Sequence, residues 1–289
     1  MSGPRPLGTG PRPLGTGPRP LGTGPRRLGD RPRPVGNGAR PVGNGAVYLD
    51  LDGTLLGPGG SLLRDAHGRF CDAGVRALGL LADADVPVIL VSGRSRARLE
   101  AMAGVIGADG VLPELGSTDA GYPTRNGQTV HQAISESGVP AALLAHEPGL
   151  EPHPLAARGR EGSHVLRGRA SARAPALVAS LSGGALQLAD NGCTGADESR
   201  VYHLLPTGAG KAAAVARDIA ARGIDARACL AIGNSRQDLD IRRIVGAVAI
   251  VANGAAADPG LAARAGWVTA GAYGEGVLEA VEEWLSSRG

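Results

Sequence analysis

From residue 46 onwards, short apolar runs alternate with segments of helical periodicity, and this alternation constrains the fold more than any other feature of the chain. The runs are rich in β-prone residues, whereas the segments between them repeat apolar residues every three or four positions. The expected strands are residues 47–51, 86–91, 110–115, 228–232, 247–252 and 267–270. The expected helices are residues 69–84, 96–106, 211–222 and 276–286. Alternation of this kind favours an α/β fold, with a parallel sheet and helices on both of its faces.

The alternation loosens between residues 117 and about 200, where Gly, Pro, His and Arg are frequent. Strand-like pieces at 164–168 and 185–189 and helical pieces at 130–137 and 174–181 predict a smaller α+β module. We expect this module to be inserted into the main domain and to lie over its sheet. The predicted domains are therefore a core of residues 46–116 and 206–289, and an insert of residues 117–205.

Residues 3–44 consist of six copies of a seven-residue unit that begins as Gly-Pro-Arg-Pro-Leu-Gly-Thr. Two prolines and two glycines in each early unit exclude a helix, so residues 1–45 are expected to form an extended, disordered tail. A start site upstream of the true one is an alternative origin for this segment. The tail carries eight Arg and one Asp, whereas the remaining residues carry 22 basic and 26 acidic groups.

The charge balance argues against binding to nucleic acid, because the sequence pI of about 9.0 belongs to the tail. Aromatic residues make up 2% of the chain, too few for a platform on which bases stack. No apolar run approaches the roughly 20 residues of a membrane span, and no apolar signal core is present. Three widely spaced cysteines without a CxxC pair favour a reducing compartment. We therefore expect a cytoplasmic protein with neither nucleic-acid nor membrane partners.

Two acids, Asp50 and Asp52, stand at the end of the first apolar run. In a strand, residues i and i+2 face the same way, so both carboxylates are expected to point together at the strand's carboxyl end. Their repulsion is offset by a cation or a proton, which suggests a metal. A simple Asx-type turn at Asp52-Gly53 is the alternative. A calcium loop is disfavoured, because Thr54 and Ser61 stand where it needs acids.

Two further strand ends carry polar groups. The run 86–91 ends in Ser92-Gly93-Arg94, whose hydroxyl and backbone amides could cradle an anion at the start of the next helix. The run 228–232 is followed by a loop that contains Asn234 and Asp238, although this loop could simply cap a helix. In open α/β sheets, ligands bind at the carboxyl ends of the strands, so these groups are expected at one edge.

Lys211 is the only lysine in the chain, whereas 29 residues are Arg. It stands at the start of a predicted helix, where a compact ammonium can act as a point charge. Chance retention of one lysine is the alternative. A phosphate-binding P-loop is excluded, because Leu205 and Ala212 occupy positions that require Gly and Ser or Thr.

Taken in chain order, the segments around Asp50, Ser92, Lys211 and Asn234 resemble the four motifs of the haloacid dehalogenase (HAD) superfamily of aspartate-nucleophile phosphohydrolases. The resemblance covers residues 46–286. The resemblance implies a Rossmann-like, doubly wound parallel core. Because the insert lies between the second and third motifs, it also implies a C2-type cap and a subfamily IIB-like phosphatase. Members of that branch act largely on sugar phosphates and related small metabolites.

The resemblance also assigns roles to residues of this chain. Asp50 matches the nucleophile, and Asp52 matches the acid/base that protonates the leaving alcohol. Ser92, with Gly93, is expected to bind the transferring phosphoryl group, and Lys211 to steady both that group and the nucleophile. The implied cofactor is Mg²⁺, with Asp50, Asp52, Asn234 and Asp238 as its expected ligands.

One position departs from the family pattern. The fourth motif normally begins Gly-Asp, and here it reads Gly233-Asn234. Asparagine offers a carbonyl oxygen but removes one negative charge, and ligand charge tunes metal affinity. We therefore expect weaker Mg²⁺ binding. Asp240 lies past the loop and is a poor substitute by spacing.

The expected function is that of a Mg²⁺-dependent phosphatase acting on a small phosphorylated metabolite, such as a sugar phosphate or a phosphoglycerate derivative. The alternatives are a phosphomutase of the same superfamily, or a ligand-binding or scaffold protein that has lost its chemistry. Specificity is expected from the insert, and the candidates to meet a second anionic group are Arg125, Arg158, Arg160, Arg167 and His164. For each of these a solvated surface role is the stronger interpretation, and His203 is expected to be packed rather than catalytic.

Overall fold

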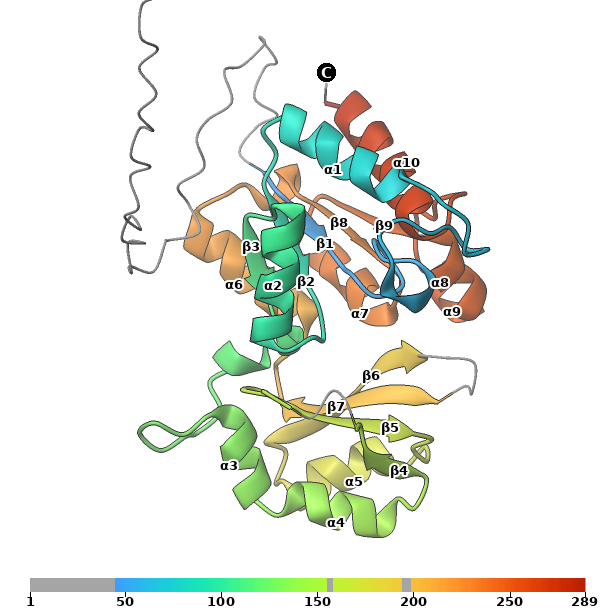
Figure 1. The fold of residues 1–289 in the computed structure, drawn as a ribbon. Helices are drawn as coiled ribbons and strands as arrows, with labels where there is room; N and C mark the ends of the chain where they lie inside the picture. The colour runs from blue at the N-terminus through green and yellow to red at the C-terminus, as the bar shows by residue number, and fades with distance from the viewer. Residues whose placement is uncertain (1–44, 155–157, 194–198, 289) are drawn as a thin grey trace, which may run out of the picture. The chain divides into compact units, whose positions relative to one another are not determined.

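The structure of this 289-residue chain is a computed structural model that describes residues 45–154, 158–193 and 199–288. The disordered tail predicted for residues 1–45 lies, apart from its last residue, outside this described part. Ala46, the first residue of the predicted core, is buried. The described chain contains a parallel and an antiparallel sheet, each with its own helices (Figure 1).

The first sheet has five parallel strands in the order β3-β2-β1-β8-β9. Its strands are β1 (Val47–Leu49), β2 (Val88–Val91), β3 (Gly110–Leu112), β8 (Leu230–Gly233) and β9 (Ala247–Ile250). The chain winds outwards from β1 to β3 and later returns to the other side of β1, through β8 to β9. This is the doubly wound arrangement that the resemblance implied.

Helices cover both faces of this sheet because its strand residues alternate between two apolar clusters. Val47 and Leu49 belong to the cluster with helices α1 (Ala73–Asp83), α2 (Arg96–Ile106) and α10 (Tyr273–Ser286). Tyr48 belongs to the opposite cluster, with α6 (Lys211–Arg222) and η4 (Asp240–Arg243). The period-two alternation of a strand therefore places the sheet between two helical layers.

Shorter elements complete the fold around this sheet. They are α7 (Arg236–Leu239), α8 (Ala252–Ala257), α9 (Pro259–Ala262), η1 (Pro58–Gly60), η2 (Glu114–Asp119) and η3 (Ala226–Ala228). No helix in the described ranges combines the length and the apolar character that a membrane crossing requires.

The second sheet has four antiparallel strands in the order β4-β5-β7-β6. The strands are β4 (Leu150–Pro152), β5 (His164–Gly168), β6 (Leu186–Cys193) and β7 (Arg200–Pro206), and the helices are α3 (Val130–Glu136), α4 (Val139–His146) and α5 (Ala174–Leu181). Tyr202 and Leu204 of β7 pack with these helices, which lie on one face of the sheet (Figure 1). His203, between them, therefore points to the opposite face.

The predicted fold class is confirmed, and several predicted boundaries shift for local reasons. The strand expected at 110–115 ends at Leu112, because Pro113 has no N–H to donate. The helix expected at 69–84 begins only at Ala73. The piece at 267–270 forms a single bridge, between Ile250 and Val268, rather than a strand.

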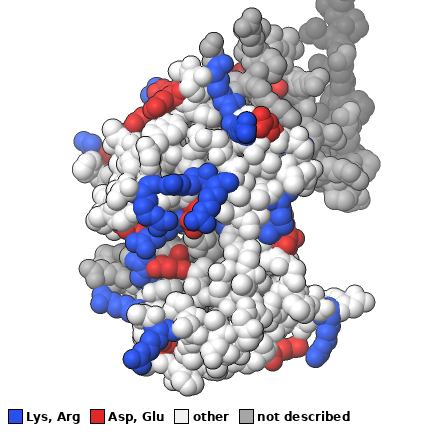
Figure 2. All heavy atoms as spheres, turned by 180° about the vertical axis from the view of Figure 1, so that it is seen from behind, with Lys and Arg blue, Asp and Glu red and all other residues white. Residues whose placement is uncertain are grey.

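Charged side chains of both signs share the surface. Figure 2 shows Lys and Arg side chains with Asp and Glu side chains beside them on the face opposite to that of Figure 1. Partly exposed ion pairs include Arg222 with Asp218 at 2.8 Å and Arg167 with Glu151 at 2.6 Å. Exposed pairs of this kind contribute about 0–1 kcal/mol each, so they do not determine the fold.

Candidate active site

Three loops with polar side chains meet at one edge of the parallel sheet. Asp50 follows β1, Ser92 follows β2 and Asn234 follows β8, and these three strands are neighbours. Parallel strands end at the same edge, so the loops lie together. The backbone N–H of Asp50 donates to the carbonyl oxygen of Ile232 at 3.0 Å and ties the first loop to strand β8.

Lys211 joins two buried carboxylates at this edge. It is the first residue of α6, and its Nζ lies 2.7 Å from Oδ1 of Asp50 and 2.8 Å from Oδ1 of Asp238. All three side chains are almost fully buried. Burial by itself lowers the pKa of Lys211, but the charges of Asp238 and Asp50 outweigh it and raise that pKa. Lys211 therefore stays charged.

Burial and the neighbouring charges shift the pKa of Asp50 upwards. Burial raises the pKa of Asp50 to about 7, the charge of Lys211 opposes this rise, and the charge of Asp238 adds to it. Burial is the largest cause of the rise, and one ammonium shared by two buried carboxylates does not offset it. The Oγ1 of Thr54 donates to the second oxygen of Asp50 at 2.8 Å and fixes the orientation of the carboxylate.

Asp238 is held by the loop that precedes it. Its Oδ2 accepts hydrogen bonds from the backbone N–H of Asn234 at 3.2 Å and of Ser235 at 3.0 Å. The Ser235 hydroxyl donates to the same oxygen. A Cβ on Gly233 would lie 2.0 Å from the Cγ of Asp238, so only glycine permits this close approach. The 233–238 segment therefore fixes the carboxylate that faces Lys211.

Asp52 binds a different partner, which corrects one prediction. The two acids do not share a strand face, because β1 ends at Leu49 and both residues lie beyond it. They remain close enough that the charge of Asp52 raises the pKa of Asp50. Arg94 donates to both oxygens of Asp52, from Nε at 2.8 Å and from Nη2 at 2.6 Å. The Asp52 side chain is half exposed, whereas that of Asp50 is buried.

Ser92 and Gly93 form the loop after β2. Ser92 is 2% exposed, and its Oγ accepts a hydrogen bond from the backbone N–H of Arg94 at 3.2 Å. The Gly93 carbonyl oxygen accepts from Nη1 of Arg160 at 2.6 Å. Arg160 precedes β5 of the antiparallel module, so the loop contacts both parts of the fold.

The oxygen-rich side chains of the site suit Mg²⁺ in their chemistry, since this ion prefers carboxylate and carbonyl oxygens. Within the described residues, no group of three or more His, Cys, Asp or Glu side chains is arranged to hold a metal. Two contacts account for this: Arg94 occupies both oxygens of Asp52, and Lys211 and the 233–238 loop occupy those of Asp238. The Asn234 side chain lies against Gly53, beside Asp52. The donor atoms therefore fit Mg²⁺ in their chemical type, while Arg94 holds Asp52 and Lys211 holds Asp238 in this arrangement.

Glu114, which the sequence analysis did not single out, is a buried link between the two parts of the fold. Its carboxylate accepts hydrogen bonds from the backbone N–H groups of Glu161, Gly162 and Ser163 at 2.9–3.1 Å and from the Ser163 hydroxyl at 3.0 Å. Arg160 lies 3.7 Å from the same carboxylate. The only sequence signal for Glu114 was an acid inside the predicted strand 110–115.

The cap candidates for a second anionic group are mostly engaged elsewhere. Arg125 lies 3.7 Å from Glu136, Arg167 pairs with Glu151, and Arg160 is buried beside Glu114. Arg158 is exposed. His164 stacks on His131 with ring centroids 4.0 Å apart. None of these contacts places a free guanidinium against Asp50.

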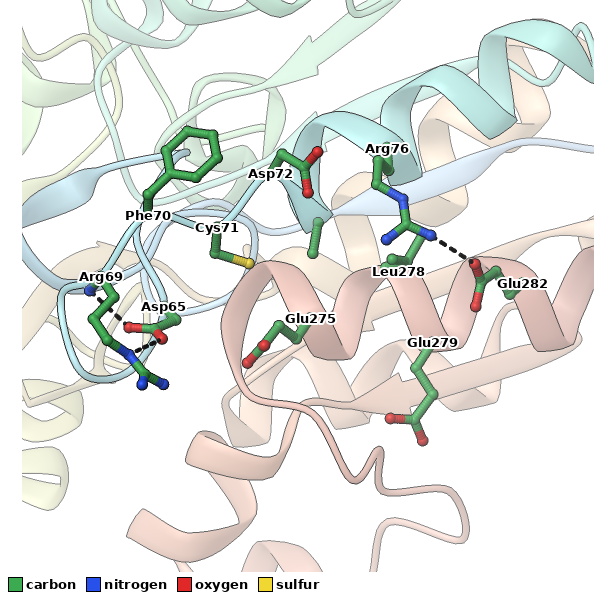
Figure 3. A pocket seen from close by; sticks show the side chains of 11 residues that line it. Asp65, Arg69, Phe70, Cys71, Asp72, Arg76, Glu275, Leu278, Glu279 and Glu282 are labelled. Carbon is green, nitrogen blue, oxygen red and sulfur yellow. Dashed lines mark hydrogen bonds and ion pairs between the residues drawn. The ribbon is translucent and has the colours of Figure 1, made fainter.

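A cavity of about 720 Å³ lies away from these residues, between α10 and the segment that leads into α1 (Figure 3). Five of its eleven lining residues are acidic, and several of the charges are already paired. Arg76 lies 3.8 Å from Glu282, and Glu279 accepts from the backbone N–H groups of Ala270 and Gly271. This cavity contains none of the residues proposed for chemistry, so its size does not mark it as the active site.

The parallel core, the acid beyond its central strand and the inserted antiparallel module together define a capped α/β phosphatase. Two proteins of similar sequence are named phosphoglycolate phosphatase. The one from Halorubrum lacusprofundi is 30% identical over 235 residues, which cover 79% of this chain and 92% of the relative. The one from Methanothermobacter thermautotrophicus is 28% identical over 245 residues, which cover 83% of this chain and 98% of the relative. This chain belongs to the same family as the Halorubrum lacusprofundi relative, a family of phosphoric monoester hydrolases, and it shares the fold of haloacid dehalogenase-like hydrolases of known structure.

Solved structures share the fold at lower sequence identity. The sucrose-phosphatase of Synechocystis sp. PCC6803 aligns with a TM-score of 0.58 and 18% identity, covering 84% of this chain and 98% of that one. A sugar phosphatase of HAD subclass IIB aligns with a TM-score of 0.58 and 15% identity, covering 83% and 98%. The cap belongs to the shared fold, because these alignments span nearly the whole of each solved chain. No protein-family model matches the sequence.

Proposed function

We propose that this protein is a Mg²⁺-dependent phosphatase that hydrolyses small phosphorylated metabolites through an aspartyl-phosphate on Asp50. The observation that carries the proposal is the contact of Lys211 Nζ with both Asp50 and Asp238, at 2.7 and 2.8 Å. Phosphoryl transfer depends mainly on positioning and on neutralising the charge spread over the phosphoryl oxygens. A buried ammonium beside a buried carboxylate supplies both functions at one point.

In this proposal, an oxygen of Asp50 attacks phosphorus while the bond from phosphorus to the leaving oxygen breaks. Asp52 gives a proton to the leaving oxygen and later takes one from the water that opens the acyl phosphate. The Ser92 hydroxyl and the Gly93 amide donate hydrogen bonds to phosphoryl oxygens. Lys211 holds Asp50 in place and balances charge on the transferred group.

Asp52 has to leave Arg94 before it can act as an acid. The guanidinium holds both oxygens of Asp52, so neither oxygen is free to reach a leaving group while the pair exists. An arriving phosphate offers Arg94 a second bidentate anion. Exchange of Arg94 from Asp52 to the substrate would couple substrate binding to release of the acid.

Mg²⁺ would be held by Asp50, Asp52, Asn234 and Asp238. When bound, it supplies charge neutralisation for the phosphate and for the carboxylates around it. The named relatives indicate the substrate range, since they are a sucrose-phosphatase and two phosphoglycolate phosphatases. A small sugar phosphate or phosphorylated acid is therefore the proposed substrate class.

The proposal is tested by phosphate release from a panel of phosphorylated metabolites, with Mg²⁺ and with EDTA. Wild type should release phosphate only with Mg²⁺, and Asp50→Asn should lose about 10³-fold or more of this activity. Asp240→Asn, an acid two residues past Asp238, is the matched control and should retain activity. Transfer of phosphate to a second sugar without release would instead indicate a mutase. Equal, absent turnover in wild type and Asp50→Asn would indicate a binding protein.

A further inference from the structure

Two polar groups of the antiparallel module converge on the loop after β2. His203 of β7 is 1% exposed, and its Nε2 lies 2.9 Å from the point that a Cβ on Gly93 would occupy. The Nδ2 of Asn191, on β6, lies 2.9 Å from the same point. Gly93 does not have a left-handed backbone conformation, so the closeness of these two side chains, rather than strain, is what excludes a larger residue.

The hydrogen bonding around Nδ1, the second ring nitrogen, fixes the tautomer of His203. Its Nδ1 lies 3.3 Å from Oγ of Ser163, which lies 3.0 Å from Oε2 of Glu114. The Glu114 carboxylate is an acceptor, so the Ser163 hydroxyl donates to it and keeps only its oxygen lone pairs for His203. Nδ1 therefore carries the proton, and Nε2 presents a lone pair towards Gly93.

The ring is also held neutral. Burial, followed by the positive charges of Arg160 and Lys211, keeps the pKa of His203 well below its ordinary value. Among the described residues, neither Nε2 of His203 nor the Asn191 amide has a hydrogen-bond partner. An acceptor and an amide donor are thus left free beside the loop proposed to bind the phosphoryl group.

We propose that His203 and Asn191 form a hydroxyl-binding pair that selects substrates with a hydroxyl group close to the phosphate. The inference rests on the proposed function, which puts the phosphoryl group at Ser92 and Gly93 and its leaving group beside this pair. A hydroxyl can donate to Nε2 and accept from Nδ2 at the same time. A carboxylate can only accept, and an alkyl group can do neither. Phosphates of polyols and sugars are therefore the substrate class, ahead of phosphorylated acids.

Three phosphate esters of nearly equal size test this selection: 2-hydroxyethyl phosphate, ethyl phosphate and phosphoglycolate. The readout is kcat/KM for phosphate release with Mg²⁺. Wild type should favour 2-hydroxyethyl phosphate over each of the other two by about tenfold or more, because a buried polar pair left unmatched penalises the analogue. Equal values for the three esters, or a preference for phosphoglycolate, would overturn the inference.

Substitutions test which residues cause the preference for 2-hydroxyethyl phosphate. His203→Leu should remove the preference, so that kcat/KM for 2-hydroxyethyl phosphate falls about tenfold relative to kcat/KM for ethyl phosphate. Ser163→Ala, which removes the group that orients His203, should weaken the preference in the same direction. His164→Leu is the matched control. His164 of β5 forms a hydrogen bond with Ser135 and stacks on His131, so it is not part of the proposed pair. Survival of the preference in His203→Leu would contradict the role of His203.

A measurement on the wild-type protein does not depend on turnover or on the folding of a variant. Long-range ¹H–¹⁵N correlation spectra should show His203 protonated at Nδ1 and not at Nε2, and a proton on Nε2 would overturn the inference. Absence of phosphate release from all three esters and from the wider metabolite panel would overturn the proposed function instead. The two failures are therefore distinguishable.

Discussion

Lys211 Nζ lies 2.7 Å from Oδ1 of Asp50, although 161 positions of sequence separate the two residues. The same ammonium lies 2.8 Å from Asp238, so one buried cation serves two buried carboxylates. The group as a whole keeps an excess negative charge. Such a group costs stability when it is buried without a further cation, and it favours the binding of one. The predictions below follow from this balance of charge and from the contacts around it.

Asp50→Asn should stabilise the protein in EDTA at neutral pH, while abolishing its activity. The folded-state pKa of Asp50, about 7, is above its ordinary value of 3.8, so the stability that this group contributes at low pH is lost as pH rises from about 4 to about 7. An asparagine at this position does not ionise, so the variant does not lose this stability as pH rises. Lys211 then keeps Asp238 as its partner. Urea unfolding should give Asp50→Asn an advantage of about 1–4 kcal/mol above pH 7 that shrinks towards pH 4. An advantage that grows at acidic pH would contradict the assigned direction of the shift.

Lys211→Met should destabilise the protein. It leaves Asp50 and Asp238 buried without a cation, and removing one partner of a buried ion pair costs about 3–5 kcal/mol. The free energy of unfolding, from urea titration at pH 7 in EDTA, measures this loss. The double variant Asp50→Asn/Lys211→Met is the control and should recover part of the loss. Equal stability of Lys211→Met and wild type would show that the ion pairs are not maintained in solution.

Asn234→Asp should restore a negative charge beside Asp52 and strengthen Mg²⁺ binding. The Asn234 side chain packs against Gly53, the residue after Asp52, with its amide nitrogen as the nearest atom. The Mg²⁺ concentration that gives half-maximal phosphate release should fall by about tenfold or more. Asp240→Asn should leave it unchanged. If Asn234→Asp leaves the Mg²⁺ dependence unaltered, Asn234 is not a ligand.

Arg94→Gln should also lower the Mg²⁺ requirement, for a different reason. Arg94 holds both oxygens of Asp52, and Mg²⁺ has to compete with it. The variant frees Asp52 but loses a cation that can meet the substrate, so KM for the phosphate ester should rise at least severalfold. Titrations of Mg²⁺ and of substrate separate the two effects. A higher Mg²⁺ requirement in Arg94→Gln would show that Arg94 does not compete with the metal.

Segments with clear periodicity or strong end signals were predictable from the sequence. Helices α2 and α6 and strand β5 begin and end at the expected residues, since each combines regular apolar spacing with a turn or glycine at its border. The three loops at the sheet edge were also predictable, because chemistry-bearing residues followed apolar runs. Lys211 stood out as the only lysine among 29 arginines.

Other features depend on contacts that local sequence does not encode. Helix α4, Val139–His146, has apolar residues around most of its surface and therefore no helical period to detect. The bidentate pair of Arg94 with Asp52 and the buried position of Glu114 arise only when distant loops meet. The contact of His203 with the loop at Gly93 likewise requires the register of β7, which sets the face on which the ring lies.

The most direct test of the central claim is chemical trapping of the intermediate. The enzyme is mixed with Mg²⁺ and a phosphate ester that it turns over, quenched in acid within one turnover, and reduced with borohydride, which converts an aspartyl-phosphate to homoserine. Peptide mass spectrometry should then find homoserine at position 50, in wild type and not in the reaction without substrate. Turnover with homoserine at another position, or with none at all, would contradict the assignment of Asp50 as the nucleophile.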